Sequence, residues 1–503
     1  MSTTTGQRAD PAALLAATPT RMFLGGGWRT SSARRRLAVT DPATGETLTS
    51  VEGGTVDDAL DALGAADRAQ PTWGAVAPRD RADILRRAYE LVSARRAGLA
   101  TLITLEMGKP LREADAEVTY AAGYLRWYAE EAVRINGRYT AGESGAGRIL
   151  TLGRPVGPCL FVTPWNFPLA MGARKIAPAL AAGCTCVVKP ASQTPLTMLA
   201  LAEILAEAGV PDGVVNVVPT SDARGVVGAL MADRRLRKLS FTGSTETGQA
   251  LLRQSAGQVL RVSLELGGNA PFVVFPDADL DAAVDGAVQA KLRNNGEACT
   301  SANRFYAHRS VAAAFTEALA ARFTALEIGH GLDPGTDVGP LIDDDQLAKV
   351  GAHVTDATGR GARVVAGGAA ADQPGHFYRP TVLDRVPDDA RLVHEEIFGP
   401  VAPVLTFDDE EDVIDRINDS PYGLAAYVFT RDLDRALTVA ERLETGMVAV
   451  NQGLVSNVAA PFGGVKHSGH GREGGPEGIA EYLSTTYVAL NAGIRPVRAG
   501  GAR

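Results

Sequence analysis

The alternation of short apolar runs with helical patterns limits the possible folds of this chain more than any other feature of its sequence. Between residues 158 and 266, five strand-like runs are separated by four helical patterns, at 171–181, 195–208, 222–231 and 245–255. Strands that alternate with helices of this length predict βαβ units and a parallel sheet. Ligands of such sheets bind beyond the carboxyl ends of the strands. The candidate binding loops are therefore 163–168, 189–194 and 242–248.

A second alternation of strands and helices begins at Pro271, so a second α/β lobe is expected. The chain has 503 residues, which is more than one hydrophobic core usually serves. Residues 1–20 lack the basic start and the apolar centre of a signal peptide, and we expect them to form a disordered N-terminal tail.

The composition excludes several classes of function. The formal net charge is −8 and no long basic run occurs, which argues against a nucleic-acid-binding surface. No apolar stretch approaches the ~18–20 residues of a membrane-spanning helix. Four cysteines without a CxxC pair are typical of reduced thiols rather than of a disulfide framework. We therefore expect a cytoplasmic enzyme with no nucleic-acid or membrane partner, and no metal site is assigned.

Cys299 differs from the other three cysteines in its surroundings. A helical pattern from Leu280 to Leu292, with Asp277 as a plausible N-cap, breaks at 294–296 and would place Cys299 on a short loop. The remaining cysteines lie inside apolar runs and are expected to pack there. Cys299 instead has Asn, Gly, Glu, Thr and Ser as neighbours. These local features leave a reactive thiol and a packed one equally open.

Glu265 and Asn166 are the polar residues that could serve such a thiol. Glu265 stands between two leucines and before two glycines, so it is either a strand-end ion pair or a base in a cleft. A carboxylate near a thiol could accept its proton and later activate a water. Asn166 lies in a turn bracketed by prolines. Its amide either caps that turn or, with the Cys299 N–H, forms an oxyanion hole.

Two loops have features of a phosphate site. Lys189 follows a buried type of strand, and Gly243 and Ser244 open a helix whose N-terminus offers N–H donors to a phosphate. Lys189 could equally be a surface cation, and many helices begin with Gly-Ser-Thr. Because both loops follow neighbouring strands, together they favour a dinucleotide.

Five motifs occur in an order that identifies a family. From about Met22 to Leu490 the chain resembles the aldehyde dehydrogenase superfamily. The motifs are Thr-Pro-Trp-Asn-Phe-Pro (163–168), Leu-Glu-Leu-Gly-Gly-Asn-Ala-Pro (264–271), Asn-Gly-Glu-Ala-Cys-Thr (295–300), Glu-Glu-Ile-Phe-Gly-Pro (395–400) and Pro-Phe-Gly-Gly-Val-Lys (461–466).

The resemblance implies a mechanism at Cys299. Its thiolate would attack an aldehyde to give a thiohemiacetal, Asn166 would hold the oxyanion, and hydride would pass to a nicotinamide. Glu265 would then activate the water that hydrolyses the thioester. Glu297 stands where many members carry Gln, which adds a carboxylate near the thiol.

The resemblance also implies the cofactor site and the fold. It assigns Lys189 to the adenosine ribose, Ser244 to the pyrophosphate, Glu396 to the nicotinamide ribose and Phe398 to the nicotinamide ring. The remaining cofactor-binding residues are Trp165, Ser192 and Gly243. The fold would be α/β, with two Rossmann-like lobes and a small β element for oligomerisation. The expected boundaries are 21–136 and 154–264 for the dinucleotide-binding domain, 265–450 for the catalytic domain, and 137–153 and 480–495 for the oligomerisation element. Its hairpin and C-terminal strand should pair between subunits, giving a homodimer or homotetramer.

Within the superfamily the run 174–185 is similar to succinate-semialdehyde dehydrogenases. This resemblance implies that Arg174, Arg293 and Ser456 bind the distal carboxylate of the substrate. A structural ion pair of the arginines with Glu117 or Glu297 is the alternative. Glutarate semialdehyde carries the same carboxylate one methylene further out, and one methylene discriminates by only ~1–3 kcal/mol. A broad-specificity or CoA-acylating aldehyde dehydrogenase and a non-catalytic relative are the further alternatives.

Two serines bear on the cofactor and on regulation. Ser192 occupies the place where NAD-selective members often carry a carboxylate, which favours NADP with NAD also used. Ser301 replaces the second cysteine of a redox switch found in some members, so no intramolecular disulfide with Cys299 is expected.

Overall fold

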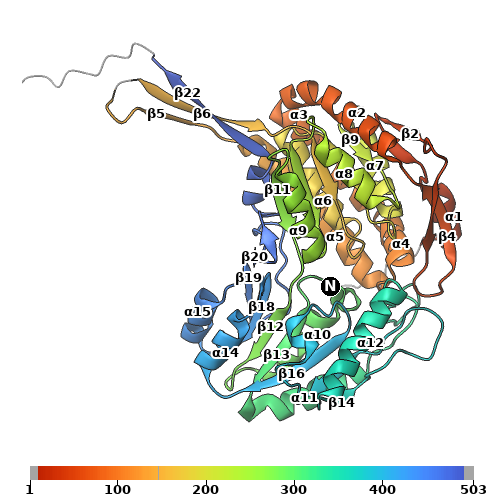
Figure 1. The fold of residues 1–503 in the computed structure, drawn as a ribbon, viewed down its shortest axis with the longest axis vertical. Helices are drawn as coiled ribbons and strands as arrows, with labels where there is room; N and C mark the ends of the chain where they lie inside the picture. The colour runs from red at the N-terminus through yellow and green to blue at the C-terminus, as the bar shows by residue number, and fades with distance from the viewer. Residues whose placement is uncertain (1–8, 146, 492–503) are drawn as a thin grey trace, which may run out of the picture.

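A computed structural model describes residues 9–145 and 147–491, which form two α/β lobes and a projecting three-stranded sheet (Figure 1). The first lobe contains an eight-stranded sheet in the order β2-β1-β9-β8-β7-β10-β11-β21. Its strands are β1 (Met22–Leu24), β2 (Gly27–Arg29), β7 (Cys159–Val162), β8 (Cys186–Lys189), β9 (Val215–Val217), β10 (Lys238–Thr242), β11 (Arg261–Glu265) and β21 (Gly469–His470). The five central strands are parallel, and β1 and β21 add to them in the antiparallel direction.

The second lobe contains a seven-stranded sheet in the order β14-β15-β16-β13-β12-β18-β19. All neighbouring strands are parallel except β14, which is antiparallel to β15. The strands are β12 (Ala270–Val274), β13 (Ala302–His308), β14 (Arg363–Ala366), β15 (Thr381–Asp384), β16 (Val401–Phe407), β18 (Ala425–Phe429) and β19 (Met447–Val450). The predicted α/β architecture of two lobes is confirmed.

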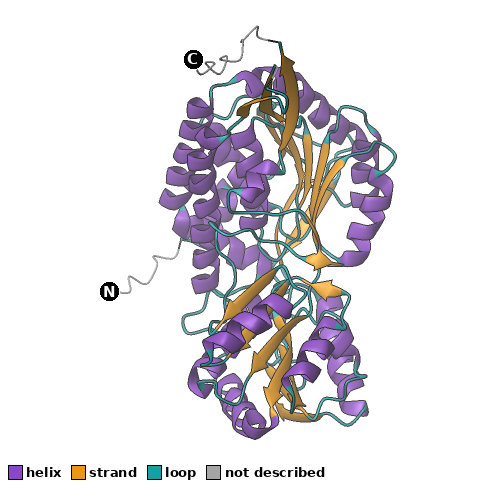
Figure 2. Cartoon of the chain, turned by 90° about the vertical axis from the view of Figure 1, so that its left-hand side faces the viewer, coloured by secondary structure: helices purple, strands orange, loops and turns teal. Residues whose placement is uncertain are grey.

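Helices flank both sheets (Figure 2). In the first lobe they are α2 (Val56–Ala75), α3 (Pro78–Ala94), α4 (Arg96–Met107), α5 (Leu111–Glu131), α6 (Ala170–Ala182), α7 (Leu196–Glu207), α8 (Ala223–Ala232) and α9 (Thr245–Ser255). In the second they are α10 (Leu280–Leu292), α11 (Arg309–Thr324), α12 (Asp344–Gly359), α13 (Arg391–His394), α14 (Glu410–Asn418) and α15 (Leu433–Arg442). None of the helices in the described ranges is long and apolar enough to cross a membrane.

Several shorter elements lie outside the two sheets and the helices that flank them. They are the hairpin of β3 (Arg36–Thr40) and β4 (Thr47–Glu52), the pair of β17 (Tyr422–Gly423) and β20 (Val465–Lys466), and the helix α16 (Glu477–Ala480). Because the central strands are covered on both sides, their successive residues enter different cores. On β7, Phe161 packs into one hydrophobic cluster and Leu160 into another on the opposite face.

The N-terminal segment corrects one prediction. Residues 1–8 lie outside the described residues, but Pro11–Ala17 form helix α1 rather than part of a disordered tail. Asp10 is its N-cap, accepting a hydrogen bond from the Ala12 N–H at 3.2 Å, and proline suits the first helical position. The side chain of Leu14 packs on the hydrophobic cluster that contains Phe161. A cap and an apolar contact therefore stabilise this short helix.

The projecting sheet consists of β5 (Arg138–Ala141), β6 (Arg148–Pro155) and β22 (Leu483–Leu490), in the order β22-β6-β5. β22 pairs with β6 along its whole length within one chain. The hairpin and the C-terminal strand thus pair with each other inside one chain, and pairing of this element between subunits stays a prediction. The register brings Leu483 opposite Pro155 shortly after the end of α16. Residues 492–495 of the expected element lie outside the described residues.

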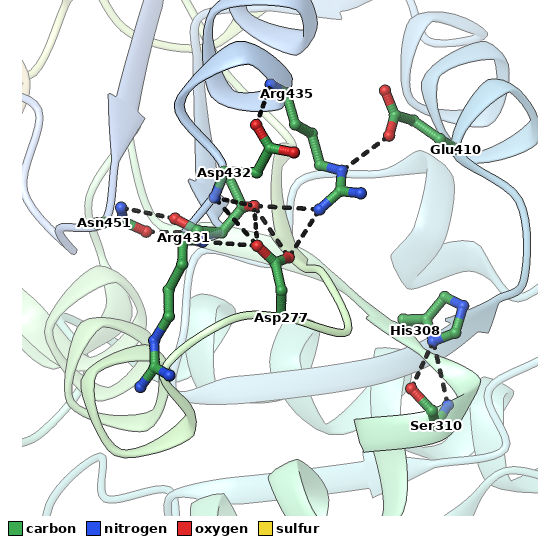
Figure 3. A network of polar contacts seen from close by, with 9 residues as sticks. Asp277, His308, Ser310, Glu410, Arg431, Asp432, Arg435 and Asn451 are labelled. Atoms are coloured by element: carbon green, nitrogen blue, oxygen red, sulfur yellow. Dashed lines mark hydrogen bonds and ion pairs between the residues drawn. The ribbon is translucent and has the colours of Figure 1, made fainter.

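Asp277 does not have the predicted role of N-cap. Asp279 caps α10 instead, accepting from the Ala282 N–H at 3.2 Å. The Asp277 carboxylate accepts hydrogen bonds from the Thr430 hydroxyl and two backbone N–H groups of the loop before α15, and from the Arg435 guanidinium of α15 itself (Figure 3). It joins two loops of the second lobe that are distant in the sequence.

Candidate active site

A cavity of about 220 Å³ lies where the two lobes meet, beyond the carboxyl ends of β7, β10 and β11. Eleven of the thirteen residues that the sequence nominated line it. These are Trp165, Asn166, Arg174, Gly243, Ser244, Glu265, Arg293, Cys299, Glu396, Phe398 and Ser456. Lys189 and Ser192 do not line this cavity.

The loop that carries Cys299 leaves α10 through three residues of left-handed backbone. Asn294, Asn295 and Gly296 have φ angles of 60°, 58° and 81°, so the helical pattern ends where the sequence predicted. Ser301 Oγ donates to the Gly296 carbonyl at 3.1 Å and closes the turn around the cysteine. Gly268 allows a close approach, because a Cβ there would lie 2.7 Å from the Cys299 carbonyl oxygen.

The Cys299 thiol is half-buried, and its electrostatic surroundings are mixed. Burial raises the pKa of the Cys299 thiol to about 12, the cation of Arg174 opposes this rise, and the carboxylates of Glu396 and Glu265 add to it. The resting cysteine is therefore a neutral thiol that needs a base to become a nucleophile.

Glu265 ends β11 and faces the same cavity. It forms no ion pair with any residue of the described ranges, so the cleft interpretation is favoured over the strand-end ion pair. Its Oε2 is buried without a hydrogen-bond partner. Burial raises the pKa of Glu265 well above its ordinary value, the charge of Glu473 raises it further, and Arg174 and Lys175 oppose the shift.

A buried charge cluster lies behind Glu265. Glu473 pairs with Arg174 at 2.7 Å and with Lys175 at 2.6 Å. Lys175 Nζ also donates to Ser240 Oγ at 3.0 Å and to Thr242 Oγ1 at 2.8 Å. One carboxylate thus serves two cations on the first turns of α6.

The side chain of Asn166 reaches across to the cysteine loop instead of capping its own turn. Its Nδ2 donates to the Glu297 carbonyl oxygen at 2.9 Å, which fixes which end of the amide faces the loop. The amide nitrogen has a second hydrogen, which remains for an acceptor in the cavity. The Glu297 carboxylate points elsewhere: its Oε1 accepts from the Ile342 N–H at 3.1 Å, and burial raises its pKa well above the ordinary value.

The opposite end of the cavity has the features of a nucleotide site. Ser244 is the N-cap of α9 and lines the cavity together with Gly243, directly after β10. Glu396 Oε1 accepts from the Gly268 N–H at 3.2 Å, and burial raises the Glu396 pKa to about 6. Phe398, at a φ of 57°, meets the Trp165 ring edge-to-face at a centroid distance of 5.4 Å.

Lys189 and Ser192 lie beside this end rather than in the cavity. Lys189 ends β8 next to Val162 of β7. Its side chain is buried, its ammonium donates no hydrogen bond to a described residue, and burial lowers its pKa to about 8. The Ser192 hydroxyl contacts Gln193 Oε1 at 3.2 Å. A buried cation without an acceptor fits an anionic or hydroxyl-rich group that is not part of the chain.

Arg174 and Arg293 line the same cavity but differ in their partners. The Arg174 guanidinium lies 3.9 Å from the Phe462 ring centroid and is paired with Glu473. An ion pair was the alternative for this residue, although its partner is neither Glu117 nor Glu297. Arg293 stacks 4.9 Å from the Phe167 ring centroid and forms no ion pair with a residue of the described chain. Like Lys349, it lines the cavity without an ion pair to a described residue and is therefore available to an anion there.

The sequence did not nominate several residues of the site. Gln346 and Lys349 of α12 line the cavity, and Gln346 Nε2 donates to the Phe398 carbonyl at 2.6 Å. Glu473 lies in a glycine-rich segment far along the chain from Arg174. No local pattern distinguishes these residues from solvent-facing polar residues, since only the tertiary fold brings them to the cavity.

Comparison with known proteins places the chain in one family. The model of the aldehyde dehydrogenase family matches residues 28–488. A succinate-semialdehyde dehydrogenase of Paenarthrobacter nicotinovorans is 57% identical over 88% of this chain and 98% of its own length. A glutarate-semialdehyde dehydrogenase of Pseudomonas putida is 48% identical over 93% and 97%. The crystal structure of an NADP-dependent enzyme of E. coli superposes with a TM-score of 0.94 at 48% identity, over 96% of this chain and 100% of that one. The chain belongs to the aldehyde dehydrogenase family.

Proposed function

We propose that this protein oxidises succinate semialdehyde to succinate with NADP, and also with NAD. The observation that carries the proposal is a cavity in which Cys299, Glu265 and Asn166 meet an unpaired cation, Arg293. The relatives named for semialdehydes with a distal carboxylate support the substrate class, and the NADP-dependent structure from E. coli supports the cofactor.

The first chemical step is addition of the Cys299 sulfur to the aldehyde carbon. Glu265 accepts the thiol proton, directly or through a water, because a neutral thiol adds poorly. As the carbonyl oxygen becomes an oxyanion, the free N–H of the Asn166 amide and the Cys299 backbone N–H donate to it. One such donor typically lowers the barrier by roughly 2.7–4 kcal/mol.

A nicotinamide, when bound, supplies the acceptor for the hydride that leaves this adduct. Its binding fits the N-terminus of α9, the Glu396 carboxylate and the buried ammonium of Lys189. Serine at position 192 leaves room and no opposing charge for a 2′-phosphate.

The second step is hydrolysis of the thioester at Cys299. Once Glu265 has released the thiol proton to solvent, its carboxylate removes a proton from a water that attacks the acyl carbon, and the Cys299 thiolate leaves. The protonated Glu265 then lies within the electrostatic influence of the charged side chains of Lys175 and Glu473. Glu265 also argues against a CoA-acylating enzyme, which needs no base for water.

The substrate carboxylate is held by Arg293, with Ser456 beside it. Succinate semialdehyde and butanal share a four-carbon chain and differ at this carboxylate, so their kcat/KM values test the proposal. We expect a preference for the semialdehyde, more efficient use of NADP than of NAD, and no turnover by Cys299→Ala. Equal kcat/KM values for both aldehydes would contradict the substrate assignment, and activity in Cys299→Ala would contradict the nucleophile.

We also propose a cytoplasmic homodimer or homotetramer. The β5 edge of the projecting sheet is unpaired among the described residues, and Tyr139 and Tyr487 on this sheet are 59% and 62% exposed. Exposed aromatic side chains on a sheet with an open edge favour a protein partner. The four free thiols support a reducing compartment. Sedimentation velocity tests the assembly, and a monomer at micromolar concentration would contradict it.

A further inference from the structure

Two buried charges lie just outside the catalytic cavity. Lys109, in the turn between α4 and α5, pairs with Glu117 of α5 at 2.6 Å, and both side chains are fully buried. The turn faces the second lobe, because the Leu111 N–H donates to the Gly331 carbonyl (Figure 1). A buried ion pair loses the hydration of both charges and does not by itself indicate a gain in stability. Its contacts suggest another role.

Both members of the pair bind the loop that carries Asn166. Lys109 Nζ donates to the Asn166 carbonyl oxygen at 2.8 Å and lies 4.1 Å from the Phe167 ring centroid. Glu117 Oε1 accepts from the Leu169 N–H at 2.9 Å and the Ala170 N–H at 3.1 Å. These N–H groups begin α6, whose N-cap residue has no side-chain acceptor of its own.

Asn166 is thus held at two points. Lys109 fixes its backbone from one side, and the Glu297 carbonyl fixes its amide from the cysteine loop. The Lys109 ammonium has three hydrogens, and Glu117, Asn166 and the face of Phe167 account for all three directions. Without Lys109, the backbone of Asn166 would lose the donor that sets its distance from Cys299.

We propose that Lys109 and Glu117 are positioning residues for the oxyanion donor: the pair holds the Asn166 amide where the Cys299 adduct forms. Neither residue lines the catalytic cavity. Their effect on catalysis is exerted through Asn166. This inference rests on the proposed function, because it assumes that Asn166 acts when sulfur adds to an aldehyde.

The test is the rate of reduced-cofactor formation in a single turnover, per active site, for Lys109→Met, Asn166→Ala and the double variant. We expect Asn166→Ala to slow this rate on the order of 10²- to 10³-fold and Lys109→Met to slow it roughly 10- to 100-fold. The single-turnover rate of the double variant should match that of Asn166→Ala within about twofold, because both substitutions act through the Asn166 amide. The dissociation constant of NADP should stay within about twofold of the wild-type value in all three.

Lys238→Met is the matched control for loss of a buried lysine. Lys238 begins β10, at the end of the strand away from the cavity, and its ammonium contacts Ser263 and Glu481. This variant should lower the thermal midpoint and leave the single-turnover rate unchanged. A Lys109→Met enzyme that behaves like this control would overturn the inference.

Glu117→Gln covers the case in which Lys109→Met does not fold. Glutamine keeps an oxygen for the Leu169 and Ala170 N–H groups but removes the charge that holds Lys109, so we expect a rate loss of about 3- to 10-fold. An unchanged rate would refute the positioning role. Failure of the proposed function would look different: the wild type would form no reduced cofactor, or Asn166→Ala would equal the wild type.

Discussion

Replacement of Arg293 by methionine separates recognition of the substrate carboxylate from the chemistry at Cys299. The Arg293 guanidinium lines the cavity, stacks on Phe167 and forms no ion pair with a described residue. Burial raises the pKa of the nearby Glu113, and the charge of Arg293 is among the causes that oppose this rise. Methionine keeps much of the apolar stem and removes the charge. We therefore expect Arg293→Met to lose affinity for the semialdehyde carboxylate and to retain turnover of butanal.

The expected magnitude follows from one charged hydrogen bond. Such a bond is worth about 1.5–3 kcal/mol, and each ~1.36 kcal/mol is a factor of ten in rate. The kcat/KM for succinate semialdehyde should therefore fall about 10- to 150-fold, mainly through KM. The kcat/KM for butanal should change by less than about threefold, because no charge is left unpaired.

The assay is the initial rate of NADP reduction with each aldehyde, and two other arginines serve as comparisons. Arg112 borders the neighbouring cavity but is paired with Asp337 at 2.8 Å, so Arg112→Met should leave both kcat/KM values within about twofold. Arg174→Met should reduce turnover of both aldehydes, because it removes one of the two cations that Glu473 binds. Equal losses for both aldehydes in Arg293→Met would refute the carboxylate role.

Three further predictions concern pH, packing and stability. Because burial raises the pKa of Glu265, its basic form becomes populated only as pH rises, and kcat should increase with pH. In Glu265→Gln the hydrolysis rate should lose this pH dependence. A flat pH profile of the wild-type enzyme would contradict the role of Glu265 as the base. Gly268→Ala should lower kcat by roughly 10²-fold, because the new Cβ would displace the Cys299 carbonyl. Gly351→Ala is the control and should leave kcat unchanged, because the space around its Cβ is open. Equal kcat values for the two variants would contradict the steric argument. Asp277→Ala should lower the free energy of unfolding by about 1–2 kcal/mol with kcat unchanged. Burial tends to raise the pKa of Asp277, but hydrogen bonds from Thr430 and the Arg431 N–H hold it below its ordinary value. The stabilisation is therefore present at neutral pH and is lost as pH falls through the lowered pKa. Denaturant titrations at neutral and acidic pH check the sign of this dependence.

The alternating pattern of strands and helices was sufficient to predict both parallel sheets and the loops at their carboxyl ends. Periodicity identifies a strand that is buried on both faces, and chain direction then places its following loop on one edge. Asn166, Gly243 and Glu265 could be located for this reason. The edge strand β21 could not, since its two residues come from a distant segment and carry no periodic signal.

The pairing of charges was less predictable than their location. The sequence shows two arginines and several acidic residues, but a pair forms only where the fold brings side chains together. Glu117 could have paired with an arginine, yet it binds Lys109, eight positions earlier, because both flank the start of α5. Arg174 binds Glu473, which the sequence places almost at the other end of the chain.

These pairings determine the charge that an incoming substrate meets. Arg174 and Lys175 share the single carboxylate of Glu473, and burial raises the pKa of the neighbouring Glu265. The ion pairs of Glu473 therefore contain one more positive than negative charge, and Arg293 adds another cation that forms no ion pair with a described residue. Both a substrate carboxylate and a Cys299 thiolate are anions that this charge stabilises. The same buried cations thus favour binding of an anionic aldehyde and formation of the nucleophile that attacks it, and a neutral aldehyde gains only the second effect.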